Sequence, residues 1–294
     1  MDDTTPENIG DSIWRIQSTV PGPSVCIIGG MHGNEAAGIE VVRMLLKEFE
    51  DGRHLASGTL TLALGNTRAI EKNERWIDGK DLNRQFSDAH LIDRIDQSWE
   101  EERAITLARL IREADLTLDI HSTNKPSSTF ICSRADERHA RVYRWFPITH
   151  VIEDPEYVFG DGPVTTDEYA DRMGKVGMCI ESGWVNDAGR IEETKRSVEA
   201  VLSDFGLSTN PLPPLPSHTI CTYRFYKTIK LDERGFTFAD GRGLASFEPL
   251  KAGEVLGYHG DDPVTLDQDA FVIFPKLKAH WQLGWPICYI AIPI

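Results

Sequence analysis

Short apolar segments alternate with longer amphipathic segments along the first two thirds of the chain, and this alternation restricts the fold more than any other feature. The short segments have the length and composition of buried strands, and the longer ones place apolar residues at helical spacing. Strands are predicted at residues 24–30, 59–64, 116–120 and 176–180, and helices at residues 36–50, 99–114 and 189–205. Strands that alternate with helices of this length form βαβ units. The predicted fold class is therefore α/β, with a mostly parallel or mixed sheet flanked by helices.

The composition changes after residue 207. Residues 208–218 (STNPLPPLPSH) contain four prolines in eleven positions, which is too many for a helix interior or a central strand. We predict an extended linker there. Residues 219–294 contain β-rich runs separated by glycine-containing turns, with no helical pattern. The predicted organisation is an α/β domain over residues 1–207, a linker over 208–218 and a small all-β domain over 219–294.

The charge balance limits the partners. The chain carries 31 Lys and Arg against 46 Asp and Glu, a net charge of −15. This charge repels nucleic-acid phosphates, and no basic run offsets it, so we expect no nucleic-acid partner. An anionic substrate would need arginines placed in its site. The sequence does not determine whether the protein forms a homo-oligomer.

The sequence also bears on location and redox environment. No apolar stretch reaches the roughly 18 residues of a membrane span, and the acidic N-terminal segment lacks the features of a signal peptide. Five cysteines, an odd number, form no CxxC pair, so we expect neither a disulfide framework nor a thiolate zinc site. We expect a cytoplasmic protein with no membrane partner.

Residues suited to metal binding follow two of the predicted strands. His32 and Glu35 lie in the glycine-rich turn GGMHGNEAAG, and His121 lies in LDIHST. Ligands bind beyond the carboxyl ends of parallel strands, so these side chains can converge. Two histidines and one carboxylate form a set that zinc enzymes use when water takes the fourth position. Each motif alone is also compatible with a solvated turn or a hydrogen-bonded structural histidine.

Two further motifs carry residues suited to catalysis. Glu181, in MCIESGW, follows an apolar strand, and shielding by Trp184 would raise its pKa as a general base requires. Arg84 can hold a carboxylate bidentately, Asn83 adds an amide donor, and Arg75 can stabilise an oxyanion. The ordinary alternatives are a strand-end glutamate paired with a cation and two exposed loop arginines.

The motifs GGMHGNEAAG, ERWIDGKDLNRQF, LDIHST and CIESGW occur in an order and at spacings that resemble the aspartoacylase and succinylglutamate desuccinylase family, part of the zinc-carboxypeptidase-like fold. The resemblance covers residues 24–205 and, more loosely, the β-rich tail. It implies that residues 1–207 form a zinc-dependent hydrolase domain with one Zn²⁺ per subunit. It also implies hydrolysis of the amide bond of a small anionic N-acyl amino acid, of the N-acyl-aspartate or N-acyl-glutamate type.

The resemblance implies roles for individual residues in the chemistry. His32, Glu35 and His121 match the zinc ligands of the family. Glu181 matches the glutamate that activates the zinc-bound water and later protonates the leaving amine. Arg75 resembles the arginine that polarises the scissile carbonyl.

The resemblance extends to substrate binding. Asn83 and Arg84 resemble the pair that holds the α-carboxylate of the amino-acid half. Arg172 lies nine residues before Glu181, close to where aspartoacylases carry an arginine for the second acidic group. The family's substrate-side tyrosine near the C-terminus has two candidates, Tyr258 and Tyr289, which the sequence does not separate.

Two other functions remain open at this point. One is a zinc carboxypeptidase acting on short peptides, and the other is a non-catalytic zinc-binding protein. Glu181 and Arg75 argue against the second, because a structural zinc site usually closes its fourth position with another protein ligand. Cobalt or manganese can also occupy a set of nitrogen and oxygen ligands. The glutamate motif reads ESGW, where animal aspartoacylases commonly have EVGP, which leaves the acyl group open.

Overall fold

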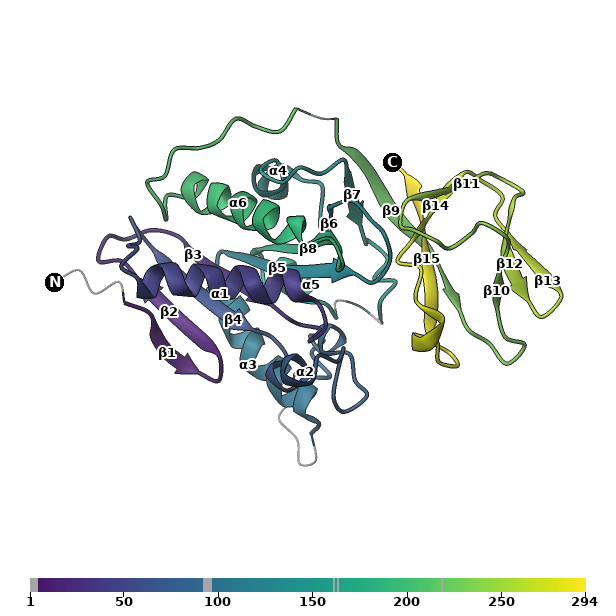
Figure 1. The fold of residues 1–294 in the computed structure, drawn as a ribbon, viewed down its shortest axis with the longest axis horizontal. Helices are drawn as coiled ribbons and strands as arrows, with labels where there is room; N and C mark the ends of the chain where they lie inside the picture. The colour runs from purple at the N-terminus through teal and green to yellow at the C-terminus, as the bar shows by residue number, and fades with distance from the viewer. Residues whose placement is uncertain (1–4, 92–96, 161, 163, 218) are drawn as a thin grey trace.

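The computed structural model describes residues 5–91, 97–160, 162, 164–217 and 219–294 of the chain. A mixed sheet of twelve strands runs through it in the order β1-β2-β4-β3-β5-β8-β6-β7-β9-β15-β14-β11 (Figure 1). A smaller sheet has the order β10-β12-β13. The strands of the first half are β1 Glu7–Gly10, β2 Ile13–Gln17, β3 Ser24–Gly29, β4 Thr59–Leu64, β5 Leu116–Thr123, β6 Phe130–Cys132, β7 His150–Glu153 and β8 Val176–Trp184. The later strands are β9 Cys221–Lys230, β10 Thr237–Phe238, β11 Glu248–Leu250, β12 Val255–His259, β13 Asp262–Thr265, β14 Ala270–Ile273 and β15 Pro286–Pro293.

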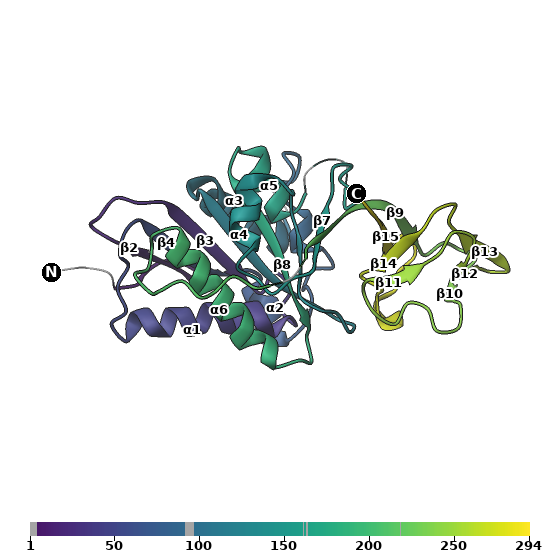
Figure 2. The same cartoon turned by 90° about the horizontal axis from the view of Figure 1, so that it is seen from above.

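Helices cover both faces of the N-terminal half of the large sheet. The helices are α1 Ala36–Glu50, α2 Thr67–Lys72, α3 Trp99–Glu113, α4 Glu137–Tyr143, α5 Thr166–Arg172 and α6 Gly189–Asp204. Seen from above, α1 and α6 lie on one face and α3 and α5 on the other (Figure 2). Two 3₁₀ turns are formed by Leu82–Arg84 and Lys278–His280. Within the described residues, no helix combines the length and the apolar character needed to cross a bilayer.

The central strands are apolar because both of their faces are covered. All eight residues of β5 are buried, and so are the residues of β3 after Ser24. One apolar core joins these strands to α1 and α6, and a second core joins the opposite face to α3 and α5. A parallel strand covered on both faces has a continuous apolar sequence. The predicted α/β fold class, with a mixed sheet flanked by helices, is confirmed.

The predicted elements agree with the structure, with one consequence for the site. The helix predicted at 36–50 has those bounds, and the other two predicted helices end one residue early. The strands predicted at 116–120 and 176–180 continue to Thr123 and Trp184. His121 and Glu181 therefore lie inside β5 and β8, where they form a register pair, and do not follow the strands. The backbone registration shifts immediately after His121, as it does at a β-bulge.

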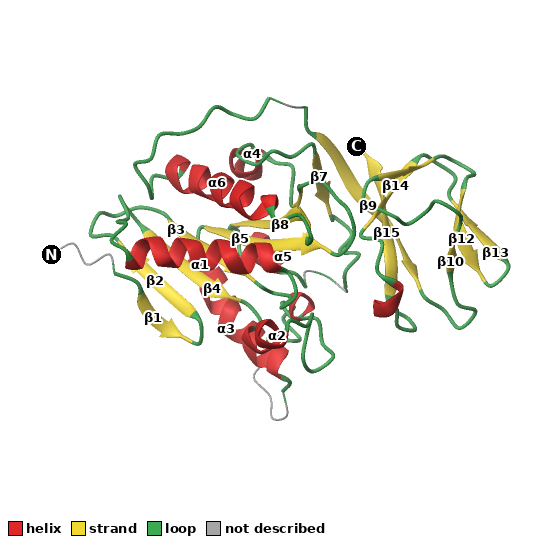
Figure 3. Cartoon of the chain, in the orientation of Figure 1, coloured by secondary structure: helices red, strands yellow, loops and turns green. Residues whose placement is uncertain are grey.

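The β-rich character of the C-terminal part is also confirmed. Figure 3 shows strands and loops there, with the 3₁₀ turn at Lys278–His280. Residues 208–217 contain neither helix nor strand, and residue 218 of the predicted linker lies outside the described residues. Strand β9 then pairs with β7 in parallel, so backbone hydrogen bonding continues from the α/β part into the C-terminal part. The division into separate domains stays a prediction, because one sheet runs through both.

A buried histidine connects two helices of the α/β part. His139 on α4 is fully buried, with Nδ1 2.7 Å from Asp136 Oδ1 and Nε2 2.9 Å from Asp171 Oδ1. Burial disfavours its charged form, but the two carboxylates raise its pKa above the ordinary value of 6.5. A histidine whose pKa is higher in the folded than in the unfolded protein contributes its full stabilisation at pH values below its unfolded-state pKa. That contribution is lost as the pH rises through its folded-state pKa.

We therefore expect the stability difference between the native protein and His139→Gln to be larger at pH 6 than at pH 9. Glutamine cannot acquire the proton, so the variant lacks the charge that both carboxylates stabilise. Denaturant unfolding of the two proteins at both pH values measures this difference. A difference that stays constant, or grows, between pH 6 and pH 9 would contradict the assignment.

Candidate functional site

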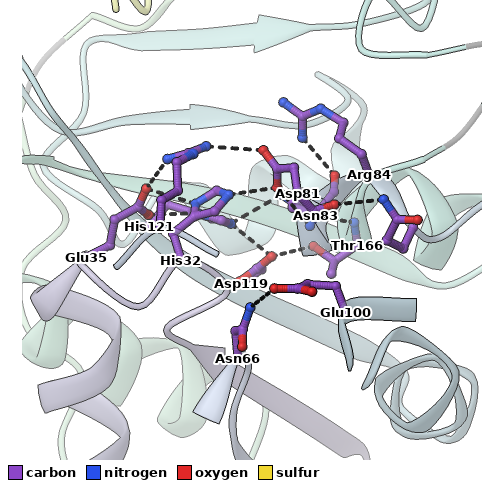
Figure 4. Close-up of polar contacts among 12 residues, drawn as sticks. His32, Glu35, Asn66, Asp81, Asn83, Arg84, Glu100, Asp119, His121 and Thr166 are labelled. Atoms are coloured by element: carbon purple, nitrogen blue, oxygen red, sulfur yellow. Dashed lines mark hydrogen bonds and ion pairs between the residues drawn. The ribbon is translucent and has the colours of Figure 1, made fainter. Parts of the chain in front are cut away.

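The turn between β3 and α1 delivers two of the predicted ligands. His32 and Glu35 are 3% exposed, and the Glu35 amide donates to the His32 carbonyl at 3.2 Å. Gly33 allows the turn to pack against α2, because a Cβ atom at this position would lie 2.1 Å from the carbonyl carbon of Ala69. Glu35 occupies the N-cap position of α1, but its side chain makes no cap hydrogen bond. Its carboxylate is directed into the site instead (Figure 4).

His32, Glu35 and His121 converge. Nδ1 of His32 lies 2.8 Å from Glu35 Oε1, and Nδ1 of His121 lies 3.0 Å from Glu35 Oε2. One ligand atom from each residue falls within 4.8 Å of the others, and all three residues are buried. The chain thus brings together two imidazoles and a carboxylate from β5 and from the turn after β3.

The surroundings of the two imidazoles fit a metal ion. His32 Nε2 lies 2.9 Å from Asp81 Oδ1, and His121 Nε2 lies 3.0 Å from Asp119 Oδ2. Metal-binding histidines commonly direct their second nitrogen at a carboxylate in this way, which leaves the other nitrogen for the metal. The buried Nδ1 of His32 has no hydrogen-bond partner among the described residues, although Glu35 is close. The donor set fits Zn²⁺.

The charges of the site are mutually stabilised. Burial opposes ionisation of Glu35, but the His32 and His121 rings hold the pKa of its carboxyl well below the usual range. Asp81 is likewise kept ionised against burial, by His32, Arg84 and Arg75, and its pKa is well below normal. Burial lowers and Asp119 raises the pKa of His121, and the net result is a pKa well above normal.

Glu181 faces the same site from the neighbouring strand. It is 7% exposed, and its Oε2 atom has no hydrogen-bond partner among the described residues. Burial, aided by the Glu35 charge, raises the pKa of Glu181 to about 7. A buried carboxylate with a pKa near neutrality and an unoccupied oxygen can accept and return a proton.

Arg75, Asn83 and Arg84 lie in the same site. Arg75 donates to Glu35 Oε1 at 2.9 Å and approaches Asp81 at 3.4 Å. The Asn83 side chain is held by its Oδ1 atom, which accepts from the Thr166 amide, and its Nδ2 atom lies 3.3 Å from His121 Nε2. Because His121 Nε2 donates to Asp119, it does not accept from Nδ2, so the Asn83 amide retains a donor for a ligand in the cavity.

Arg84 has the clearest substrate-facing position of the three. It donates to the Asn83 carbonyl at 2.7 Å, and its guanidinium stacks over Phe159 at 4.4 Å. It also donates a hydrogen bond to the hydroxyl of Tyr289 on β15. Tyr258, in contrast, is 39% exposed on β12 in the small sheet. The tyrosine that the C-terminal part supplies to this site is therefore Tyr289.

A cavity of about 470 Å³ contains these groups and admits a small molecule. Of the predicted site residues, those that line it are His32, Glu35, Arg75, Asn83, Arg84, His121 and Glu181. Lys276, which was not predicted, lines it from the C-terminal part. Burial lowers the pKa of Lys276 to about 8, and the charges of Arg75 and Arg84 act in the same direction.

Arg172 is the exception, and its predicted role as a second carboxylate-binding residue is not supported. Its Nη1 atom lies 2.6 Å from Asp88 Oδ2, and it does not line the cavity. Helix α5 presents Asp167 and Asp171 to the cavity, one turn apart. Arg172 is turned about 100° from Asp171 around the helix axis, toward Asp88.

Sequence reasoning also missed Asp81 and Asp119, the carboxylates behind the two histidines. Asp119 lies two residues before His121 on a strand, hence on the same face, so the alternation of side chains could have identified it. Asp81 had no such signal. It caps the 3₁₀ turn by accepting from the Asn83 amide, and only the folded loop brings it to His32.

Comparisons with known sequences identify relatives of the chain. The model described as the succinylglutamate desuccinylase/aspartoacylase catalytic domain matches residues 21–204. The succinylglutamate desuccinylase of Shewanella denitrificans is 25% identical over 297 residues, covering 94% of this chain and 84% of the relative. The probable aspartoacylase of Nostoc sp. is 24% identical over 279 residues, covering 88% of this chain and 93% of the relative.

Solved structures share the fold. The succinylglutamate desuccinylase from Chromobacterium violaceum superposes with a TM-score of 0.76 at 20% identity, covering 97% of this chain and 89% of that structure. Murine aminoacylase 3 superposes with a TM-score of 0.73 at 20% identity, covering 94% and 97%. At this identity the likeness concerns the fold, and the roles of individual residues rest on the geometry above.

We expect Asp81→Asn to weaken Zn²⁺ binding about tenfold, at the lower end of the ~10–100-fold effects of such outer carboxylates. Asparagine keeps the hydrogen-bond acceptor for His32 Nε2 but removes the charge that makes the imidazole a stronger ligand. Competition with a chromogenic chelator measures the affinity. The control is Asp267→Asn, which removes an exposed carboxylate in the C-terminal part. Equal affinities for the native protein and Asp81→Asn would contradict this role.

Proposed function

The chain belongs to the succinylglutamate desuccinylase/aspartoacylase family, and we propose that it is a zinc-dependent hydrolase of the amide bond in a small N-acyl amino acid. Family membership supports the hydrolysis of N-acyl amino acids. The metal, the residue roles and the form of the substrate are our proposal. The observation that carries it is the convergence of two imidazoles and a carboxylate beside a buried glutamate with an unpartnered oxygen.

The metal site consists of His32, Glu35 and His121. Zn²⁺ bound there supplies a water whose pKa falls toward about 7 and a Lewis acid for the scissile carbonyl. The chain contributes the orientation of the ligands. Asp81 and Asp119 fix the two imidazoles, while Arg75 and the Ser122 amide donate to the Glu35 carboxylate.

Glu181 carries the proton. Its carboxylate accepts a proton from the attacking water and then donates it to the nitrogen of the broken amide bond, which leaves as an amine. A pKa of about 7 suits both steps, because the group is a competent base and a competent acid near neutral pH. Arg75 lines the cavity beside Glu35 and stabilises the oxyanion that develops on the attacked carbonyl.

Arg84 orients the substrate. Its guanidinium, held by the Asn83 carbonyl and Phe159, faces the cavity and binds the free α-carboxylate of the amino-acid half. Tyr289 and Lys276 line this side of the cavity from the C-terminal part. The cavity volume of about 470 Å³ favours a small N-acyl amino acid over a longer peptide, which needs an open groove.

We expect Glu181→Gln to lower kcat by roughly 10²–10⁴-fold without loss of bound zinc, because glutamine has a similar size but cannot transfer a proton. Steady-state kinetics and metal analysis of the same preparation test this. Glu71→Gln, at an exposed position on α2, serves as the control for a lost carboxylate. Unchanged turnover would remove Glu181 from the reaction, and absence of any turnover in the native protein would favour a non-catalytic zinc-binding protein.

We also expect N-acyl amino acids to be hydrolysed at least tenfold faster, in kcat/KM, than dipeptides with the same C-terminal residue. A dipeptide differs from these substrates only in its acyl half, which adds an ammonium group and a side chain that the cavity of about 470 Å³ must also accommodate. Acetyl and succinyl derivatives assayed beside the dipeptides decide between the two reactions. Faster dipeptide cleavage would identify a carboxypeptidase.

A further inference from the structure

Of the carboxylates that line the cavity, five form no ion pair with a described basic side chain, and three of these five lie on or beside α5. These three are Asp154, which follows β7, and Asp167 and Glu168 on α5. None of the three forms an ion pair within 4.0 Å with a described Lys, Arg or His side chain. Asp154 Oδ1 accepts from the Val158 amide, and its buried Oδ2 atom has no hydrogen-bond partner among the described residues. We call these three residues the acidic wall.

The acidic wall differs from the other carboxylates that line the cavity. Asp171 is paired with His139 and Arg134, and Glu153 accepts from the Ala135 amide. Asp154 instead contacts the Glu168 carboxyl, and burial together with that charge raises the pKa of Asp154 to about 7. Burial and the Glu168 charge also raise the pKa of Asp167 well above normal. These carboxylates repel one another, and a cation among them would relieve the repulsion.

The rest of the cavity indicates a charged ligand independently of this wall. Glu181 is more than nine-tenths buried, with an unpartnered oxygen, and it lines the cavity. Lys276 lines it too, and its ammonium has no described carboxylate within 4.0 Å. Lys276, Arg75 and Arg84 lie close enough for their charges to oppose one another. Arg84 lies between the other two cations and the acidic wall, because its charge also acts on Asp154 and Glu168 although it forms no ion pair within 4.0 Å with either.

A metal ion does not suit the acidic wall. Among the described residues, His32, Glu35 and His121 form the one set of three His, Cys, Asp or Glu residues with ligand atoms within 4.8 Å. The three carboxylates of the wall do not offer three oxygen atoms within 4.8 Å of one another, so they do not form a three-ligand metal site. A substrate ammonium needs no complete coordination shell, and it can donate to two of the carboxylates while the third acts through its charge.

Resting on the proposed function, we propose that the amino-acid half of the substrate carries a side-chain ammonium, bound by Asp154, Asp167 and Glu168, while Arg84 binds its α-carboxylate. The substrate class is an N-acyl diamino acid that keeps one free amino group. The expected second arginine, Arg172, pairs with Asp88, and α5 presents carboxylates in its place. The anionic N-acyl-aspartate or N-acyl-glutamate expected from the sequence would place a carboxylate against the acidic wall.

The zinc-loaded full chain is assayed with Nα-acetyl and Nα-succinyl derivatives of ornithine, lysine, glutamine and glutamate. We expect kcat/KM for an ornithine or lysine derivative to exceed that for the glutamine derivative at least tenfold. Equal or faster hydrolysis of the glutamine or glutamate derivative overturns the inference and leaves the proposed function intact. Hydrolysis of none of them overturns the proposed function and the inference together.

Asp154→Asn tests the wall directly, because asparagine retains the acceptor for the Val158 amide and loses the charge. We expect the ratio of kcat/KM for the ammonium substrate to that for the glutamine derivative to fall about 10- to 100-fold, the usual effect of losing a charged hydrogen-bond partner. Asp167→Asn lowers the same ratio and covers the case in which the first variant misfolds. Glu156→Gln removes an exposed charge two residues from Asp154 and leaves the ratio unchanged. An unchanged ratio in both wall variants overturns the inference.

Discussion

The register of three neighbouring parallel strands is the constraint on which the site depends. β3 pairs with β5, and β5 pairs with β8, so the chain segments that leave these strands meet at one edge of the sheet. The turn after β3 carries His32 and Glu35, and the register places His121 beside Glu181. A shift of one residue in either ladder would turn these side chains to the opposite face of the sheet. The apolar cores on both faces prevent that shift, because the same register buries the strand residues.

Burial of charge at the predicted metal ligands is tolerated because each of these groups has a partner of opposite charge. His32 and His121 each have a carboxylate on Nε2, and Arg75 neutralises part of the Glu35 charge. Breaking one member of such a set leaves an uncompensated buried charge, which is strongly destabilising. The acidic wall forms no ion pair within 4.0 Å among the described residues, although Glu168 accepts from the Val164 and Thr165 amides and the Arg84 charge acts on Asp154 and Glu168. The contrast between an ion-paired metal site and a wall without ion pairs in one cavity is the physical basis for assigning the wall to the substrate.

The C-terminal strands complete the cavity. β9 extends the large sheet from β7, and β15 pairs with β9. This pairing brings Tyr289 on β15 next to Arg84. Lys276 approaches from the segment before β15. The rings of Trp76 and Trp285, whose centroids are 5.3 Å apart, form a second contact between the two parts of the chain, next to Arg75. The cavity is therefore lined by both parts of the chain, although the predicted metal ligands come from the first.

The sequence by itself determined the longer elements of the α/β part and the motifs that contain the predicted site residues. Helical and strand periodicity depends on local burial, and it placed α1 and β4 at their observed bounds. The four motifs GGMHGNEAAG, ERWIDGKDLNRQF, LDIHST and CIESGW together sufficed to identify the family. The short elements β6, β7, α4 and α5 were missed, because segments of three to seven residues contain too few positions for a periodic signal.

Only the tertiary structure decided which charges face the substrate. Arg172 and Asp171 are adjacent in sequence, yet one points to Asp88 and the other lines the cavity, because packing of α5 sets its rotation. Tyr258 and Tyr289 are both on β strands, and only the pairing of β15 with β9 brings one of them to Arg84. The acidic wall joins the residue after β7 to two residues of α5, and its lack of an ion pair depends on distances through space. Spacing along the chain does not contain that information.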